Sequence, residues 1–207
     1  MLVNQTVREF VDIVASDAPA PGGGSVAALA GAMAAGLAVM VCNLTIGRPK
    51  YAMVEQELLS VKSRAEVIQQ QLLELVDRDT ESFNKVMTAY RLPKASEEET
   101  LVRSRAIQAA SQDAAQVPLQ TAELCWEVLQ ITDTLVSKAN PNAITDMGVA
   151  AKISETGLQG AVYNVLINLG SIKDEEFCRS ARERCQALVA QSRVVLDKVG
   201  KAVEDSL

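Results

Sequence analysis

Apolar residues recur at helical spacing along almost the whole chain, and no stretch alternates between apolar and polar residues as a half-buried strand would. Capping boxes mark two helix starts, one at Thr6 and Glu9 and the other at Ser96 and Glu99. Helices are expected at about 7–14, 25–44, 54–90 and 96–115, the last with an apolar stripe that resumes over 121–135, and further helices at about 146–169 and around 178–199. Pro118 should kink or divide the fourth, because proline lacks an N–H and crowds the preceding turn.

These elements predict an all-α fold, a bundle of long antiparallel helices that forms a single domain over residues 1–207. The second helix lies in a run without charged residues, from Ala18 to Gly47. The run is long enough to span a membrane. However, it is mostly Ala and Gly, prolines interrupt its start, and no aromatic or basic residue anchors its N-terminal side.

We therefore expect this Ala/Gly-rich helix to be buried on all sides, in a soluble bundle or a subunit interface. Ala27, Gly31 and Ala35 are spaced by four, so they form one face that permits the close approach of another helix. Such a helix needs other helices packed against its whole surface, and a second copy of the chain could bury part of it. The pattern therefore predicts a homodimer.

Composition narrows the classes of function. The chain of 207 residues has no histidine, 4 cysteines without a C-x-x-C pair, 3% aromatic residues and a formal net charge of -6. Catalytic triads and imidazole metal ligands are thus excluded, and acid–base chemistry must rest on carboxylates, lysine, tyrosine or thiols with shifted pKa values. Few aromatics and a negative charge argue against nucleic-acid binding. The cysteines suit reduced, buried positions in a cytoplasmic protein, and no secretory signal precedes the first apolar run.

Gly22, Gly23, Gly24 and Ser25 stand just before the uncharged helix. The glycines remove side-chain bulk, so backbone N–H groups at the helix start can face an anion or a carbonyl group. Their formal match to a dinucleotide-binding fingerprint lacks the required strand. The alternative is a tight turn with Ser25 as the N-cap.

Asp79 falls on the apolar stripe of the long helix, between Val76 and Phe83. A buried carboxylate is costly unless it is paired or hydrated. We expect Asp79 to lie in a cleft or to meet a cation, with its pKa raised by desolvation or lowered by its partner. The alternative places Asp79 at the edge of the stripe, in water.

Two loops carry further candidates. Arg48-Pro49-Lys50-Tyr51 is the basic cluster beside the uncharged helix, and Arg48 or Lys50 could hold an acidic substrate or stabilise negative charge. The alternative is an ordinary solvated loop. The loop with Asn142 leads to Thr145 and Asp146, which are either N-caps or ligand-facing groups at a helix start.

Asn164 and Asn168 share one face of the following helix with small residues. Two amides in such surroundings indicate hydrogen bonds across a close helix contact, or into a cleft. The contact is the favoured interpretation.

Residues 18–31, A-P-A-P-G-G-G-S-V-A-A-L-A-G, resemble the signature of the formiminotransferase-cyclodeaminase C-terminal domain family. The resemblance continues, in order, through 47–51, Asp79-x-x-x-Phe83, 90–94, 142–151 and 164–169. It thus covers nearly the whole chain. Because no formiminotransferase domain is present, the chain is similar to free-standing bacterial members.

The resemblance implies an all-helical, dimeric, cytoplasmic enzyme of folate one-carbon metabolism. It implies a tetrahydrofolate derivative as substrate and no metal or redox cofactor. From the composition and the content of the uncharged run, we expect neither a nucleic acid nor a membrane as partner. The first implied reaction is that of a cyclodeaminase, which closes 5-formimidoyltetrahydrofolate to 5,10-methenyltetrahydrofolate and releases ammonia. The alternative is a methenyltetrahydrofolate cyclohydrolase, which gives 10-formyltetrahydrofolate. A further alternative is a helical protein that binds folate without turnover.

The resemblance also assigns roles as hypotheses. Asp79 and Asp146 would be an acid–base pair, or one would orient the pterin N–H groups while the other moves protons. Lys50 would assist proton transfer or bind the folate carboxylates. The substrate-binding residues would be Gly22, Gly23, Gly24, Ser25, Arg48, Tyr51, Asn142, Asn164 and Asn168.

Overall fold

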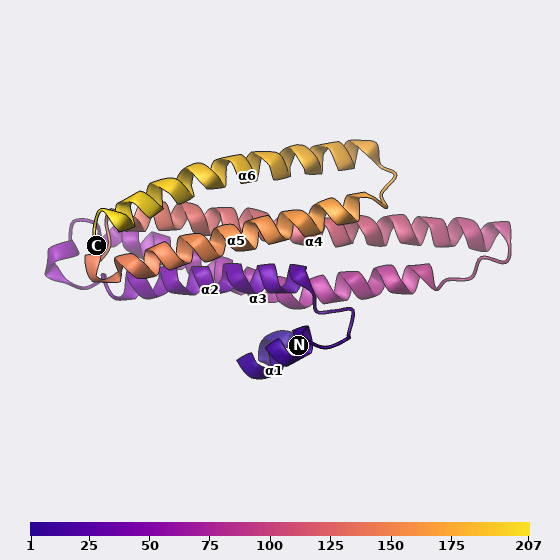
Figure 1. Ribbon diagram of the computed structural model, residues 1–207, viewed down its shortest axis with the longest axis horizontal. Coiled ribbons are helices and arrows are strands. Elements are labelled where there is room, and N and C mark those ends of the chain that lie inside the picture. The colour runs from indigo at the N-terminus through magenta and orange to yellow at the C-terminus, as the bar shows by residue number, and fades with distance from the viewer.

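The computed structural model describes residues 1–207 and contains helices and no strands. The α-helices are α1 (Val7–Val14), α2 (Gly23–Asn43), α3 (Glu55–Tyr90), α4 (Glu97–Val136), α5 (Ile144–Leu169) and α6 (Glu175–Glu204). Short 3-10 turns are η1 (Leu2–Asn4), η2 (Pro49–Tyr51) and η3 (Pro141–Ala143). Helices α2 to α6 form an elongated bundle, and short α1 lies beside it (Figure 1). The predicted all-α bundle is confirmed.

Both predicted capping boxes are formed. Thr6 accepts a hydrogen bond from the backbone N–H of Glu9, whose carboxylate accepts from the N–H of Thr6. Ser96 and Glu99 make the same reciprocal pair at the start of α4. Each box satisfies N–H groups that have no partner inside the helix, which is why these two boundaries could be located from the sequence.

Of the two effects predicted for Pro118, the division of α4 does not occur: the helix continues from Glu97 to Val136 through the buried proline. Because proline has no N–H, the carbonyl group of Ala114 lacks the donor that normally comes from four residues later. Asn168 on α5 supplies it, since its side-chain Nδ2 donates to the Ala114 oxygen at 2.8 Å. A side chain of the neighbouring helix thus provides the hydrogen-bond donor that the proline lacks.

The small residues of α2 allow close helix contacts in the core. Ala27, Gly31 and Ala35 are buried, as predicted. A Cβ atom added at Gly31 would lie 2.5 Å from the sulfur of Cys125 on α4, and one at Gly157 on α5 would lie 2.9 Å from the Ala27 carbonyl oxygen. Only glycine fits where these three helices meet.

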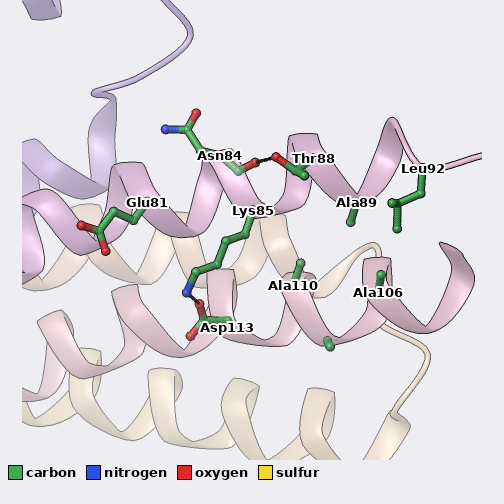
Figure 2. A pocket seen from close by; sticks show the side chains of 10 residues that line it. Glu81, Asn84, Lys85, Thr88, Ala89, Leu92, Ala106, Ala110 and Asp113 are labelled. Atoms are coloured by element: carbon green, nitrogen blue, oxygen red, sulfur yellow. Dashed lines mark hydrogen bonds and ion pairs between the residues drawn. The ribbon is translucent and has the colours of Figure 1, made fainter. Parts of the chain in front are cut away.

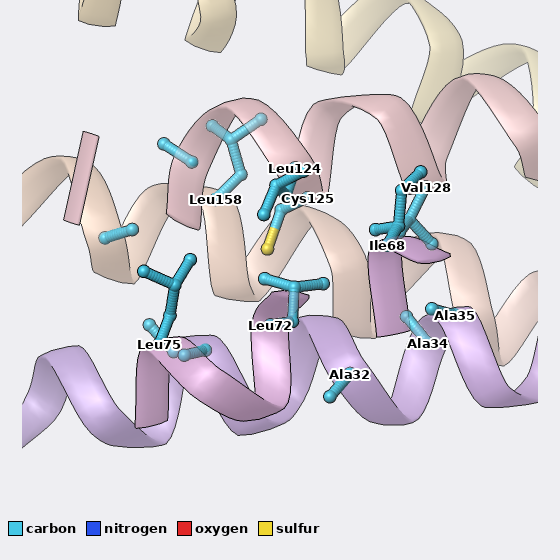
Figure 3. Packing of buried hydrophobic residues seen from close by; sticks show 14 of the residues in the cluster. Ala32, Ala34, Ala35, Ile68, Leu72, Leu75, Leu124, Cys125, Val128 and Leu158 are labelled. Carbon is cyan, nitrogen blue, oxygen red and sulfur yellow. The ribbon is translucent and has the colours of Figure 1, made fainter. Parts of the chain in front are cut away.

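Cys125 occupies this crossing with its sulfur directed towards Leu72 of α3 (Figure 3). Burial raises the pKa of the Cys125 thiol to about 12. No cysteine is in a disulfide, and Cys42, Cys125 and Cys185 are buried while Cys178 is partly exposed. The expectation of reduced cysteines that pack as small apolar side chains is confirmed for the three buried ones.

Helix α2 is long and apolar enough to cross a membrane, and 56% of its most apolar window is buried inside the bundle. Within a single chain α2 is therefore not buried on all sides, and the alternative that its remaining surface lies in a subunit interface stays a prediction. The exposed part forms a stripe that includes Val26, Met33 and Leu44.

The ends of α3 and α4 that face each other extend beyond the other helices as a hairpin (Figure 1). Tyr90, which the periodicity placed on the core stripe of α3, is 46% exposed there. Its ring lies 5.7 Å from the guanidinium carbon of Arg103, across the hairpin. The apolar stripe of α3 is exposed here because no third helix extends to this end of the hairpin.

Candidate active site

Asp79 on α3 lies against the first turn of α2. The backbone N–H of Ser25 donates to Oδ2 of Asp79 at 2.9 Å. The Ser25 hydroxyl oxygen lies 2.8 Å from the Val76 carbonyl oxygen and 3.2 Å from the same oxygen of Asp79. The carboxylate thus satisfies an N–H group at the start of α2, where the helix dipole also favours negative charge.

The helix begins earlier than the interpretation of Ser25 as its N-cap required. Gly22 is the N-cap, and it offers no side chain to the helix, so Ser25 lies inside the first turn. That interpretation is wrong, and Asp79 provides the acceptor from a different helix. Asp79 meets N–H and O–H donors in place of the expected cation, and its partly buried position excludes the alternative of a fully hydrated carboxylate.

Burial raises the pKa of Asp79 above the ordinary value for an aspartate, and the hydrogen bonds from the side chain and backbone of Ser25 oppose this effect. Desolvation is the largest cause because it penalises the charged form. A carboxyl group with a raised pKa can both hold and release a proton closer to neutral pH than an ordinary aspartate.

Gly24 is required for this contact. A Cβ atom at Gly24 would lie 2.1 Å from Oδ1 of Asp79, far inside the van der Waals distance, whereas one at Gly22 would meet nothing within 4 Å. A Cβ at Gly23 would lie 3.3 Å from Nδ2 of Asn164 on α5. The glycine run therefore lets α2 approach both α3 and α5.

Asn164 and Asn168 lie on the side of α5 that faces this region. Asn164 donates its amide to the carbonyl of Gly160 at 2.8 Å. The Asn168 amide donates to the carbonyls of Ala114 and Asn164, both at 2.8 Å. The interpretation of a close helix contact fits Asn168, whose N–H groups are used within the bundle, while Asn164 stands beside the start of α2.

Arg48, Lys50 and Tyr51 lie at the opposite end of α2, in and beside the turn η2. Gly47 has a φ of +78°, which allows the chain to reverse before this turn. Arg48 and Lys50 are exposed and have no ion-pair partner, and Nζ of Lys50 lies 5.5 Å from the centre of the Tyr51 ring.

Asn142 and Asp146 lie at this same end. Asn140 anchors their loop, because its N–H donates to Oγ1 of Thr45 at 3.0 Å and its amide to the Leu44 carbonyl at 3.3 Å. The N-cap of α5 is Ala143, so the interpretation of Thr145 or Asp146 as the N-cap is wrong. Asp146 lies in the first turn, partly exposed.

The candidate residues thus form two groups in one chain. The first group comprises Gly22, Gly23, Gly24, Ser25, Asp79, Asn164 and Asn168, and the second comprises Arg48, Lys50, Tyr51, Asn142 and Asp146. The 21 residues of α2 separate them, which corresponds to about 30 Å at 1.5 Å per residue. The Asp79 and Asp146 of one chain therefore do not meet at one reacting carbon.

A cavity of about 650 Å³ lies between α3 and α4, further towards the hairpin (Figure 2). Alanines of α4 form much of its apolar wall, and Lys85 of α3 donates to Asp113 of α4 at 3.0 Å at one side. Its volume is that of a small-molecule pocket. Its other polar residues are Glu81, Asn84 and Thr88. These three residues recur at helical spacing on α3. This polar pattern could have indicated the cavity, but the sequence analysis followed the apolar stripe of the same helix.

Comparison with known proteins gives consistent results. The family model described as Formiminotransferase-cyclodeaminase matches residues 6–187. A methenyltetrahydrofolate cyclohydrolase of Methylorubrum extorquens is 38% identical over 207 residues, and the match covers 100% of both proteins. A formimidoyltransferase-cyclodeaminase of Rattus norvegicus is 35% identical over 192 residues, or 93% of this chain and 36% of the rat protein. The chain thus spans about a third of that relative's length.

The structure also has a close solved neighbour. The crystal structure of a formiminotetrahydrofolate cyclodeaminase from Thermotoga maritima has a TM-score of 0.89 and 33% identity, with 99% of this chain and 98% of that chain covered. Sequence and fold agree over the full length. This chain therefore belongs to the formiminotransferase-cyclodeaminase family.

Proposed function

We propose that this protein is an enzyme that acts on the carbon bridging N5 and N10 of tetrahydrofolate, and that it hydrolyses 5,10-methenyltetrahydrofolate to 10-formyltetrahydrofolate. The observation that carries the proposal is the partly buried carboxyl group of Asp79, with its raised pKa, at the glycine-lined start of α2. The similarity to a cyclohydrolase over both full lengths supports the choice of reaction.

The reaction removes two protons from water and delivers one to N5, so that one proton is released to the solvent. Water adds to the bridging carbon of the methenyl cation and loses a proton, which gives a tetrahedral carbon with a hydroxyl group between two nitrogens. The bond from that carbon to N5 then breaks and N5 takes a proton, while the hydroxyl group loses its proton and the carbon stays on N10 as a formyl group. Asp79 accepts the first proton as a carboxylate and gives it to N5 as an acid.

The remaining candidate residues bind the folate or assist the proton transfer. Arg48, Lys50 and Asp146 lie about 30 Å from Asp79 within one chain, so their roles depend on the expected homodimer, in which a second copy brings them to the same folate. There Lys50 and Arg48 supply positive charge for the carboxylates of the folate tail, and Lys50 can assist proton transfer. Asp146 hydrogen-bonds pterin N–H groups or shares the proton transfer, and Asn164 contributes an amide beside the start of α2. These proton transfers need no metal or redox cofactor, and we place the enzyme in the cytoplasm.

The test is the enzyme-dependent loss of methenyltetrahydrofolate absorbance, measured above the rate in buffer alone. Asp79→Asn should lower kcat by about 10² to 10⁴, because a neutral amide cannot accept the proton. Asp197→Asn, at an exposed position on α6, is the matched control and should keep the wild-type rate. Wild-type turnover in Asp79→Asn would contradict the proposal, as would tight folate binding without any turnover.

A second candidate is the cyclodeaminase reaction, which the likeness to the Thermotoga maritima enzyme favours. Here N10 attacks the formimidoyl carbon of 5-formimidoyltetrahydrofolate, and ammonia leaves after it has taken up a proton. The same carbon becomes tetrahedral, so Asp79 would serve both reactions. The appearance of methenyl absorbance and ammonia from the formimidoyl substrate identifies this activity.

A further inference from the structure

The buried hydroxyl group of Ser25 lies among three oxygen atoms and has one proton to donate. Its Oγ is 2.8 Å from the Val76 carbonyl oxygen, 3.2 Å from Oδ2 of Asp79 and 3.3 Å from Oγ1 of Thr80. A hydroxyl group donates one hydrogen bond and can accept others, and its proton turns about the Cβ–Oγ bond without any movement of heavy atoms. The acceptor that it chooses can therefore change with the charge of Asp79.

Thr80 lies one position after Asp79 on α3 and decides whether the Ser25 proton is free. If Thr80 donates to Ser25, that proton can turn either to the Val76 carbonyl or to Asp79. If Ser25 donates to Thr80 instead, it has no proton left for the carboxylate. A charged Asp79 favours the first direction, because hydrogen bonds to a charged group are the stronger ones.

The two carboxyl oxygens of Asp79 have different surroundings. Oδ2 accepts from the backbone N–H of Ser25 at 2.9 Å and lies beside the hydroxyl group of the same residue. Oδ1 accepts no hydrogen bond from the chain and is not fully buried, so it is open to solvent. It occupies the space that Gly24 leaves by having no Cβ. An incoming proton therefore has room at Oδ1, whereas donors already surround Oδ2.

We propose that the hydroxyl groups of Ser25 and Thr80 follow the charge of Asp79 and leave Oδ1 as the oxygen that carries the catalytic proton. When the carboxylate is charged, the Ser25 proton turns to Oδ2. When Oδ1 has taken a proton from water, the Ser25 proton turns to the Val76 carbonyl, and Oδ1 then gives its proton to N5. Ser25 and Thr80 are thus positioning residues. This inference rests on the proposed function, in which Asp79 gains and loses a proton in each turnover.

The helices packed against Asp79 are uncharged beside it. Helix α2 has no charged residue, α5 contributes amides, and α4 is uncharged over 114–122. On α3 itself, Asp77 accepts the N–H of the first residue of η1, and Arg78 forms an ion pair with α4. Glu81 lines the cavity between α3 and α4. Burial and the hydrogen bonds from Ser25 therefore remain as the causes that set the pKa of Asp79.

A nuclear magnetic resonance titration of the aspartate carboxyl carbons measures the pKa of Asp79, with Asp79→Asn to identify its signal. Ser25→Ala should raise this pKa, because the charged form loses a hydrogen bond. Thr80→Val should raise it by less, since a hydroxyl group that accepts a hydrogen bond is itself a stronger donor. Thr80→Ser keeps the hydroxyl group and should restore the wild-type pKa. Thr156→Val removes an exposed hydroxyl group of α5 and is the matched control.

The direction of the shift in Thr80→Val is decisive. If Ser25 donates to Thr80 in the wild-type protein, the valine frees the Ser25 proton for Asp79, and the pKa falls. A lower or unchanged pKa in Thr80→Val overturns the inference. An unchanged pKa in Ser25→Ala overturns it as well.

The pH dependence of kcat separates positioning from substrate binding. Because Asp79 must be charged to accept a proton, the acid limb of the Ser25→Ala profile should move to higher pH, with kcat about tenfold lower on that limb and KM unchanged. A raised KM with an unchanged profile would mean that Ser25 binds the folate, and overturns the inference. Lys50 and Asp146 of a second copy are the same in every variant. Wild-type protein without turnover contradicts the proposed function instead, and the carboxyl titration still decides the role of the two hydroxyl groups.

Discussion

Asp79 illustrates how one side chain can serve both fold and chemistry. Its oxygen accepts the N–H of Ser25, and Gly24 leaves room for its other oxygen. The same burial that places the carboxylate at the start of α2 penalises its charge. The group is thus held in a position that costs folding free energy at neutral pH, as is common for residues kept for function.

The first prediction concerns stability. The pKa of Asp79 is raised from its ordinary value of 3.8, so the folded state binds this proton more tightly than the unfolded state. The free energy of unfolding should therefore fall as pH rises from about 4 through the folded pKa. The Asp79→Asn variant cannot titrate at this position and lacks this pH-dependent loss. Its free energy of unfolding, minus that of wild type, should therefore be greater at pH 7 than at pH 4. Urea titrations at both pH values measure this, and an unchanged difference would refute it.

The second prediction concerns Gly24. Gly24→Ala should keep the fold and lower kcat/KM by about 10²-fold, since its Cβ forces Asp79 to move and small misplacements of a reacting group are costly. Gly200→Ala on α6 introduces a Cβ into open space and should have the wild-type rate. Steady-state kinetics with circular dichroism separates the two effects, and a fully active Gly24→Ala would contradict the role of this contact.

Helix boundaries could be predicted where local chemistry determines them, as at the two capping boxes. The prediction failed where a distant element decides the outcome. Pro118 stays inside α4 because Asn168, on the neighbouring helix α5, provides the missing donor. Asp79 likewise replaces the side-chain N-cap that local inspection assigned to Ser25. The spacing of residues along the sequence shows which face of a helix a residue occupies. It does not show which neighbouring helix will provide its hydrogen-bond partner.

The third prediction tests whether Asn168 replaces the hydrogen-bond donor that Pro118 lacks. Asn168→Leu should destabilise the fold by about 1–3 kcal/mol, because the Ala114 carbonyl loses its only side-chain donor. In a Pro118→Ala background the loss should be smaller, since the alanine has a backbone N–H that can donate to that carbonyl within the helix. A double-mutant cycle from urea denaturation measures the coupling, and additive effects would show that the two residues are independent.

At the scale of the whole molecule, the sequence identified the two groups of candidate residues but not their separation. Helical periodicity places Asp79 and Asp146 on particular helices, yet it carries no information on which ends of those helices meet. The predicted pair fails to assemble in one chain because α5 runs antiparallel to α2, with Asn164 beside Gly23 and its first turn near Leu44.

The fourth prediction follows from the homodimer that the sequence predicts. The Tm should rise with protein concentration, because association stabilises the folded chains by mass action. Specific activity should also fall when the enzyme is diluted below the dissociation constant. Differential scanning calorimetry over a hundredfold concentration range measures the first effect. Met33→Glu places a charge on the exposed apolar stripe of α2 and should therefore show no such dependence. A wild-type Tm that is independent of concentration would contradict a dissociable dimer.

The crossing that contains Cys125 has a kinetic consequence. Its thiol is enclosed where α2, α4 and α5 meet, so a reagent can reach it only after those helices separate. The labelling rate of Cys125 therefore measures how often the bundle opens, with no engineered probe. Mass spectrometry should find Cys178 labelled first and Cys125 much later, and folate should slow the later step. Equal rates at both cysteines would mean that this crossing opens as readily as the surface.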